Sequence, residues 1–194
     1  DLLIETAVSR GATAVVARRA RAWLDLNRDP REIDPATVEG PMPRDMISTV
    51  RTRSGLGLIP RRIGTGPQLW RRRYTAAEID DRIAAIHAPY HDAVDVLLTS
   101  ARARFGIAVL IDCHSMPPVT GPNLRERPDV VIGDRFGRSA QAGLTDRIES
   151  IIAAQGFRTA RNTPYAGGYT LDRHGRPERG VHAVQIAIEV EAAV

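Results

Sequence analysis

The sequence predicts an α/β fold because runs of strand character alternate with helical patterns along the chain. Two runs, residues 106–113 and 129–134, are apolar almost throughout and close on polar side chains. A further run, residues 182–190, alternates strictly between apolar side chains and others. Strands that alternate with helices in this way form a sheet with helices packed on it, so we expect one α/β sheet.

The start of the chain predicts a short helix, a strand and a long irregular stretch. Residues 1–8 resemble the end of an amphipathic helix that is already under way, so we expect an upstream segment that this chain lacks. The small, β-branched run at residues 11–17 predicts a buried strand. Residues 25–66 are rich in proline, glycine and arginine, which indicates a long functional or mobile loop.

A long amphipathic helix is predicted to follow the capping box Thr75-Ala76-Ala77-Glu78. Its apolar positions recur every three or four residues from Ile79 to Ala101. Pro89 lies inside this pattern. Because proline has no N–H group, we expect it to kink the helix or to split it in two.

The second half of the chain predicts strands on either side of one helix. Residues 106–113 indicate a central strand covered on both faces, and residues 129–134 repeat the pattern. A helix capped by Ser139 is expected to end at Gly156. The strand at residues 182–190 would then close the sheet.

Composition and charge exclude several classes of protein. The chain has 194 residues, 43% hydrophobic and 26% charged, as in ordinary globular proteins. No apolar run approaches the ~18 residues of a membrane span. The net charge is +4 and every basic side chain is arginine, but these arginines are interleaved with acids, so we expect no nucleic-acid partner. A single cysteine, Cys113, and no signal-like segment favour the cytoplasm.

Asp112-Cys113-His114-Ser115 is the first candidate for chemistry, since α/β sheets place their sites at the carboxyl ends of strands. A histidine at that position is held by rigid backbone, as a metal ligand must be. Asp112 could orient the imidazole, as carboxylates do for ligating histidines. A histidine that caps the strand end for structural reasons is an equally good interpretation.

His87 and His91 lie four residues apart on one face of the predicted helix, a spacing seen in helical zinc pairs. The chain has no HExxH pattern, and Pro89 distorts the geometry between the two histidines. We therefore favour one histidine that faces solvent and one that packs or forms a hydrogen bond. His91 stays a candidate for substrate contact, because the backbone near the proline is irregular.

Two loop segments could contact a substrate. Arg28 could hold a carboxylate through two parallel hydrogen bonds, with Asn27 donating its amide, although taken alone it would be an exposed loop arginine. Residues 162–169 form a turn with two tyrosines and a glycine pair that lets backbone approach a ligand. A plain surface turn explains this segment equally well, and the same ambiguity applies to residues 172–182.

Together these segments resemble the N-formylglutamate amidohydrolase family, zinc hydrolases related in fold to the metallocarboxypeptidases. The matching stretches run in family order over nearly the whole chain: DLNRDPREID, GLGLIPRRIGTG, PYH, LIDCHSMP, RPDVVIGDRFGRS, ARNTPYAGGY and GVHAVQI. The resemblance implies a three-layer α/β/α sandwich around a mixed sheet, of the zinc-carboxypeptidase and phosphorylase/hydrolase-like type. It further implies that residues 1–194 form a single domain without its N-terminal segment.

The resemblance also implies one zinc ion, with His114 as a ligand. The family's other ligands, a histidine and an acidic residue, would lie upstream of Asp1. Asn27 and Arg28 match the Asn-Arg pair that grips the substrate carboxylate in the carboxypeptidase relatives. The motifs expected to line the substrate pocket contain His91, Asn162, Tyr165 and His182.

The activity that the resemblance implies is metal-dependent hydrolysis of a linear amide. N-formyl-L-glutamate would yield formate and L-glutamate, the last step of a histidine degradation route, with this small N-acyl amino acid as the protein's partner. In the family the last strand reads Gln-Ile-Glu, and the glutamate is the natural general base. Here the order is Gln185-Ile186-Ala187, so the candidate base is Glu189, two residues on, brought closer by a register shift or bulge.

Two other functions compete with this one. An amidase or peptidase of the same fold could act on a different N-acyl amino acid or on a γ-glutamyl link. A catalytically impaired homologue could bind such a ligand without turnover, as Ala187 would suggest.

Overall fold

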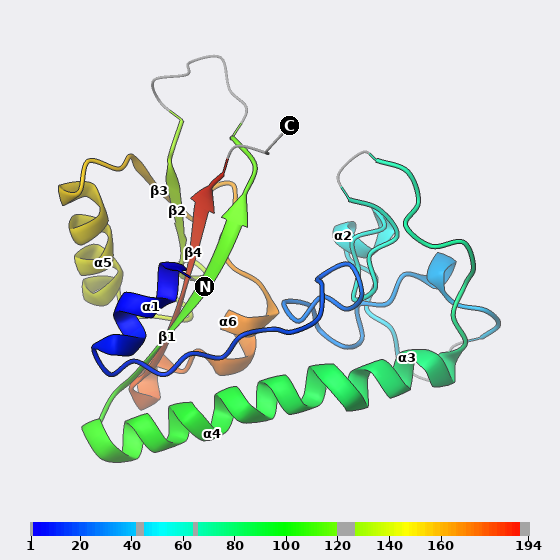
Figure 1. Ribbon diagram of the computed structural model, residues 1–194, viewed down its shortest axis with the longest axis horizontal. Coiled ribbons are helices and arrows are strands. Elements are labelled where there is room, and N and C mark those ends of the chain that lie inside the picture. The colour runs from blue at the N-terminus through cyan, green and yellow to red at the C-terminus, as the bar shows by residue number, and fades with distance from the viewer. Residues whose placement is uncertain (1, 42–44, 64–65, 120–126, 191–194) are drawn as a thin grey trace. The chain divides into compact units, whose positions relative to one another are not determined.

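The computed structural model describes residues 2–41, 45–63, 66–119 and 127–190. The chain divides into two compact units, residues 1–97 and 98–194. Figure 1 shows the elements of both units.

The first unit opens with a helix, α1 (Leu2–Ser9), as the sequence predicts. The strand predicted over residues 11–17 is wrong, because these residues form no strand and all of them are exposed. Val15 and Val16 are 37% and 39% exposed. Their β-branched side chains favour a strand only where a neighbouring strand offers hydrogen bonds and a packing surface, and no described strand pairs with this run.

The described residues between 25 and 66 are largely irregular, as predicted, and the elements that they form are a 3₁₀ turn, η1 (Pro35–Thr37), and one short helix, α2 (Val50–Arg53). This stretch nevertheless contributes to a core, because several of its apolar side chains pack against the helix that follows. The buried cluster comprises Leu24, Ile33, Val38, Leu58, Ile59, Tyr74 and Ile79.

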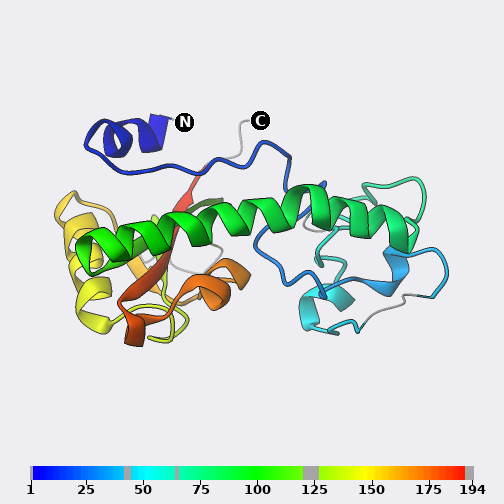
Figure 2. The same ribbon diagram turned by 90° about the horizontal axis from the view of Figure 1, so that it is seen from below.

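The long helical run comprises α3 (Ala76–Arg82), a π-helical segment η2 (Ile83–His87) and α4 (Ala88–Phe105). Its capping box is confirmed: the Thr75 side chain accepts from Glu78 N–H, and the Glu78 side chain accepts from Thr75 N–H. The kink or break expected at Pro89 does not appear, because the three segments follow one another without a gap. Figure 2 shows the run as one continuous ribbon. Because proline cannot donate to the carbonyl four residues earlier, the wider π turn just before it accommodates the missing bond.

The second unit is built on a four-stranded mixed sheet of β1 (Ala108–Met116), β2 (Val130–Gly133), β3 (Thr159–Arg161) and β4 (Val181–Glu189). The strand order is β1-β4-β2-β3. β1 runs parallel to β4 and β2 parallel to β3, whereas β2 and β4 are antiparallel. The predicted α/β class and mixed sheet are confirmed.

The prediction for β1 is wrong about where the strand ends and about how well it is covered. The strand continues to Met116, so Asp112 and His114 lie within it, and among the described strands it pairs with β4 alone. Val109 and Ile111 are each 43% exposed, so this strand is not covered on both faces. β4 and β2 occupy the two interior positions instead. An apolar run shows that a strand is favoured, but not how many neighbours it has.

Helix α5 (Ala142–Ala154) covers one face of the sheet, where Ile148 and Ile152 pack against a cluster that includes Val184 and Ile186. The predicted cap, Ser139, does not cap this helix, because its hydroxyl donates to the carbonyl of Ala183 at 2.7 Å. A short helix, α6 (Tyr169–His174), and a 3₁₀ turn, η4 (Pro177–Arg179), lead into β4.

Candidate active site

The Asp112–His114 pair lies on the face of the sheet opposite α5. His114 Nε2 is 2.9 Å from Asp112 Oδ2, and the two side chains are 22% and 11% exposed. In the register of β1 and β4, Asp112 pairs with Gln185 and His114 with Ala187. Since these positions belong to a regular ladder, the imidazole is carried by rigid backbone. The carboxylate lies beside it, although Asp112 Oδ2 accepts no hydrogen bond from the described residues, so its orienting role stays a prediction.

Tyr165 lies over the same face of the sheet. It packs against the cluster formed by Met116, Val131 and Ala187, and Ala187 is the register partner of His114. The structure therefore brings this tyrosine to the sheet face that carries the histidine, as expected of a residue that lines a pocket there. Its contact with a substrate stays a prediction.

Glu189 lies beside Met116, two residues beyond Ala187. The ladder is regular to its end, so neither a bulge nor a register shift brings Glu189 to the position of Ala187. Its Oε2 atom is buried and accepts no hydrogen bond from the residues that the structure describes. The catalytic role of Glu189 stays a prediction.

His182 lies on the other face of the sheet. Successive residues of a strand point to opposite faces, so His182 shares the side of Val184 and Ile186, which pack on the α5 side. Its Nδ1 accepts from the N–H of Gln141 at 3.3 Å, just before α5. The structure does not bring His182 together with His114, and its substrate contact stays a prediction.

The side chain of Asn162 holds the turn that follows β2. Its Oδ1 accepts from the N–H groups of Asp134 and Phe136 at 3.1 and 3.3 Å, and its Nδ2 donates to Asp134 Oδ1 at 2.8 Å. Arg135, Phe136 and Asn162 itself all have positive φ, at 56°, 58° and 58°. Such left-handed residues persist only where the surroundings enforce them, and here the Asn162 amide does so. Its predicted place in the pocket remains untested.

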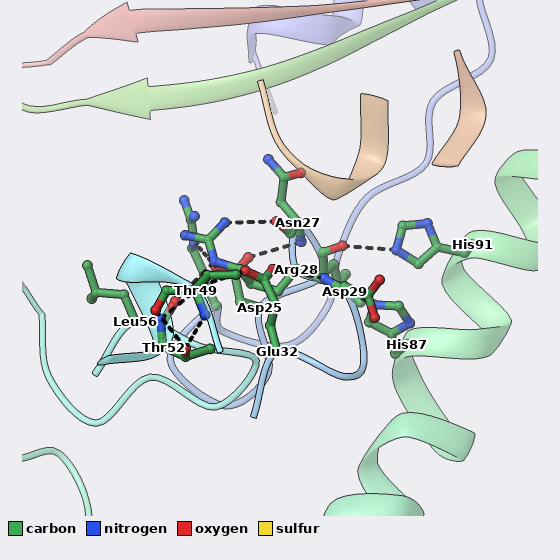
Figure 3. Close-up of polar contacts among 12 residues, drawn as sticks. Asp25, Asn27, Arg28, Asp29, Glu32, Thr49, Thr52, Leu56, His87 and His91 are labelled. Carbon is green, nitrogen blue, oxygen red and sulfur yellow. Dashed lines mark hydrogen bonds and ion pairs between the residues drawn. The ribbon is translucent and has the colours of Figure 1, made fainter. Parts of the chain in front are cut away.

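In the first unit, the loop at residues 25–32 surrounds the buried side chain of Arg28, shown in Figure 3. Arg28 Nε donates to the carbonyl of Leu56 at 3.0 Å, and Nη1 donates to that of Asn27 at 2.8 Å. Asp25 Oδ1 accepts from Asn27 N–H at 3.0 Å, while its Oδ2 accepts from Arg21 Nε at 2.9 Å. Arg28 is only 6% exposed, so it is no ordinary loop arginine on the surface.

The charge balance around Arg28 favours an anionic ligand. Burial lowers the pKa of the Arg28 guanidinium, and the carboxylate of Asp25 opposes this effect. Arg51, Arg21 and Glu32 are the other charged groups that act on it. The two acids and the two arginines around Arg28 cancel, so the one excess positive charge of the group is that of Arg28 itself. Arg28 Nη2 makes no hydrogen bond with the described residues and is thus available to a carboxylate.

His87 and His91 are both buried, 2% and 0% exposed, so the expectation that one of them faces solvent is wrong. His87 Nε2 donates to the carbonyl of Arg28, and His91 Nε2 to that of Leu26, each at 2.9 Å. The structure thus brings His91 to the Asn27–Arg28 loop, where it contacts backbone. The four-residue spacing showed that the two side chains share a face, but not which segment that face meets.

The described residues supply only part of the ligand set that a zinc ion needs. Asp112 and His114 have the arrangement of a ligating histidine and its orienting carboxylate. A catalytic zinc site uses about three protein ligands. Within the described ranges, no group of three or more histidine, cysteine, aspartate or glutamate residues could hold a metal ion. The part of the chain that the structure describes therefore supplies one ligand with its partner, and no complete site.

Fold and site together define an α/β protein whose mixed sheet carries a histidine beside a carboxylate. Residues 1–192 match the model of a family described as N-formylglutamate amidohydrolase. The chain belongs to this family, which confirms the resemblance that its motifs indicate.

Two curated relatives are named N-formylglutamate deformylase. The protein of Pseudomonas aeruginosa is 31% identical over 191 residues, and that of Pseudomonas putida is 27% identical over 191 residues. Each match covers 96% of this chain and 66% of the relative. The chain thus spans slightly less than two thirds of the length of these relatives.

Two solved structures share the fold. The N-formylglutamate amidohydrolase of Ralstonia eutropha JMP134 matches with a TM-score of 0.79 and 34% identity, over 87% of this chain and 62% of that one. The gene product Atu2144 of Agrobacterium tumefaciens matches with a TM-score of 0.61 over 89% of this chain and 57% of that one. Its identity is 22%, so that likeness concerns the fold alone.

None of the helices within the described residues has both the length and the apolar character needed to cross a bilayer. Cytoplasmic localisation stays a prediction, as does the single domain over residues 1–194.

Proposed function

We propose that the full-length protein is an amidohydrolase that cleaves N-formyl-L-glutamate to formate and L-glutamate. The observation that carries this proposal is the buried guanidinium of Arg28, whose positive charge remains once the two acids and two arginines around it cancel. The membership of the chain in the amidohydrolase family supports the same substrate, which carries two carboxylates. The reaction would be the last step of a histidine degradation route in the cytoplasm.

Arg28 binds one carboxylate of the substrate in this proposal, with Asn27 beside it. A guanidinium and a carboxylate form parallel, charge-assisted hydrogen bonds, which fix the orientation of the ligand as well as its position. Because the substrate is held by its carboxylate, the formyl amide is presented in one orientation, and the entropy cost of reaching the transition state falls.

We propose His114 as one ligand of a zinc ion, with Asp112 orienting the imidazole. The remaining ligands are not among the described residues. A zinc ion bound there supplies Lewis-acid activation of the formyl carbonyl. The role of the chain's own residues is to fix the imidazole on β1 and to hold its ring plane through Asp112.

Glu189 is the proposed general base, since it is the carboxylate of β4 on the sheet face that carries His114. It would take a proton from the attacking water and pass it to the leaving amine. We expect Glu189→Gln to lower kcat by ~10²–10⁴-fold, the usual contribution of acid–base catalysis, without loss of zinc. Measurement of kcat together with metal content checks this. Unchanged turnover would assign the base to another residue.

The proposed activity is tested with the purified full-length protein, zinc and N-formyl-L-glutamate, by a direct assay of formate. We expect formate release that stops when a chelator removes the metal. N-acetylglutamate and a γ-glutamyl peptide serve as comparison substrates. If zinc is bound and no formate appears, the protein acts on another acyl amino acid or is not an enzyme.

A second candidate function is ligand binding without catalysis. Ala187 favours it, because this residue pairs with His114 at the position where the sequence resemblance places a glutamate. Calorimetry with N-formyl-L-glutamate separates the two functions. Binding of the substrate with no formate release supports the binding protein, and steady turnover excludes it.

A further inference from the structure

Two histidines from one helical run hold the backbone on both sides of Asn27. The carbonyl of Leu26 accepts from His91 Nε2, and the carbonyl of Arg28 accepts from His87 Nε2, each at 2.9 Å. Figure 3 shows both imidazoles directed at the loop from the helix. His87 ends the π-helical segment and His91 follows in α4, with ring centroids 4.5 Å apart.

The loop around Asn27 is not part of any regular secondary structure. Residues 25–34 belong to no strand and no helix, so no ladder of backbone bonds determines where Asn27 and Arg28 lie. Several contacts of this segment are internal to it, including Arg28 Nη1 to the Asn27 carbonyl and Asn27 N–H to Asp25. Internal contacts move with the loop and cannot position it.

External contacts are therefore the ones that locate the loop. Besides the two histidines, these include the hydrogen bonds from Arg28 Nε to the Leu56 carbonyl and from Asp25 N–H to the Leu58 carbonyl. Farther along the loop, the N–H groups of Ile47 and Leu58 donate to the carbonyls of Arg31 and Glu32. The histidine contacts join residues 59 and 65 positions apart in the sequence. They are also the bonds immediately next to Asn27, where a small backbone rotation would turn the side chains that follow.

We infer that His87 and His91 are positioning residues, which hold the backbone on either side of Asn27 so that Asn27 and Arg28 meet a substrate carboxylate in one orientation. This inference rests on the proposed function of Arg28. It differs from the sequence-based expectation for His91, which placed that imidazole against the substrate itself. Here the imidazole acts through the backbone of the loop.

The first experiment compares His91→Leu with His91→Gln in the full-length protein. Leucine removes the donor, whereas the glutamine amide can place an N–H near the position of Nε2. We expect His91→Leu to raise KM for N-formyl-L-glutamate about tenfold, with kcat changed less than about twofold. His91→Gln should recover most of the affinity. The pair His87→Leu and His87→Gln should behave alike.

The second experiment asks whether the histidine acts through Arg28. In a protein that carries Arg28→Ala, the further change His91→Leu should lower kcat/KM less than about twofold, because coupled residues are not additive. His174→Leu is the matched control, since His174 is a buried histidine of α6, 3% exposed, in the other unit. Any loss that it causes should be the same with and without Arg28.

The outcomes separate this inference from the proposed function. If the unaltered protein releases no formate, the proposed function fails and the inference fails with it. If the unaltered protein is active, the inference is overturned when His91→Leu lowers kcat at constant KM. It is overturned equally when His91→Gln is as damaged as His91→Leu in KM, or when the losses from His91→Leu and Arg28→Ala are additive.

Discussion

The loop around Arg28 and the sheet face around His114 position polar side chains in different ways. Arg28 stands on irregular backbone that is located by scattered contacts with distant parts of the sequence, among them the side chains of His87 and His91. His114 stands in a strand that pairs with β4 at nine successive positions. The same requirement, an exact orientation, is thus met once by side-chain contacts and once by a backbone ladder.

This difference has a mechanical consequence. In the sheet, many backbone hydrogen bonds determine the geometry, so replacing one side chain removes its chemistry and leaves its neighbours in place. In the loop, each side-chain contact is a substantial part of the support, so one replacement also moves the residues that it holds. Substitutions in the two regions should therefore differ in what they disturb.

His114→Ala should have the largest effect. It removes the proposed zinc ligand, so we expect loss of both turnover and bound zinc, beyond the ~10–100-fold that loss of an orienting partner costs. Asp112→Asn is the matched variant and should lie within that ~10–100-fold range. Metal content and kcat measured on the same samples check both. Full zinc content in His114→Ala would assign the metal to other residues.

Arg28→Ala should have the next largest effect. The loss of a hydrogen-bonded charge from the substrate site should lower kcat/KM by ~10–100-fold. Bound zinc should not change. Steady-state kinetics with metal analysis provides the check, and Arg53→Ala, an exposed arginine of α2, serves as the control. Loss of zinc in Arg28→Ala would contradict a purely substrate-binding role.

The turn held by Asn162 sharpens the comparison, because it is an irregular segment within the unit that contains the sheet. Asn162→Ala removes the acceptor of a part-buried N–H group, that of Asp134, and of an exposed one, that of Phe136, so we expect the free energy of unfolding to fall by ~1 kcal/mol. Asn162→Gly is the control, since glycine tolerates the positive φ and removes only the side-chain contacts. Denaturant unfolding measures both, and equal stability of Asn162→Gly and the unaltered protein would show that the amide contributes nothing.

The smallest effect is expected for Asp129→Asn at the start of β2. Hydrogen bonds from the Arg158 side chain lower the pKa of Asp129 to about 2. A carboxyl group with a lowered pKa stabilises the fold above its unfolded pKa of ~3.9 and loses that contribution as the pH falls toward about 2. The stability difference between the unaltered protein and Asp129→Asn should therefore be constant from pH 7 to about pH 5 and vanish near pH 2.

That pH dependence is measured by urea unfolding at several pH values. The pair is exposed, so its contribution is small, as for most surface ion pairs. A difference that persisted at low pH would show that the charge of Asp129 is not its source.

Patterns between neighbours in the sequence predicted much of the fold. The capping box at Thr75 and the periodic helix after it depend on contacts within one or two turns, and both are present. The strand at residues 182–190 was recognised from its alternation and appears as β4. The errors concern partners: residues 11–17 have strand character with no strand beside them, and β1 was expected to have two covered faces.

The candidate site follows the same division. Motif chemistry identified Arg28 and His114 as candidates from residue type and local setting, and their roles stay predictions. Local chemistry could also show that His87 and His91 share a helix face. That this face meets the carbonyls on either side of Asn27, and that Asn162 holds the turn after β2, depend on contacts between residues 26 to 65 positions apart. Such contacts form only when the chain has packed, because loop closure and burial bring together groups that no short-range pattern relates.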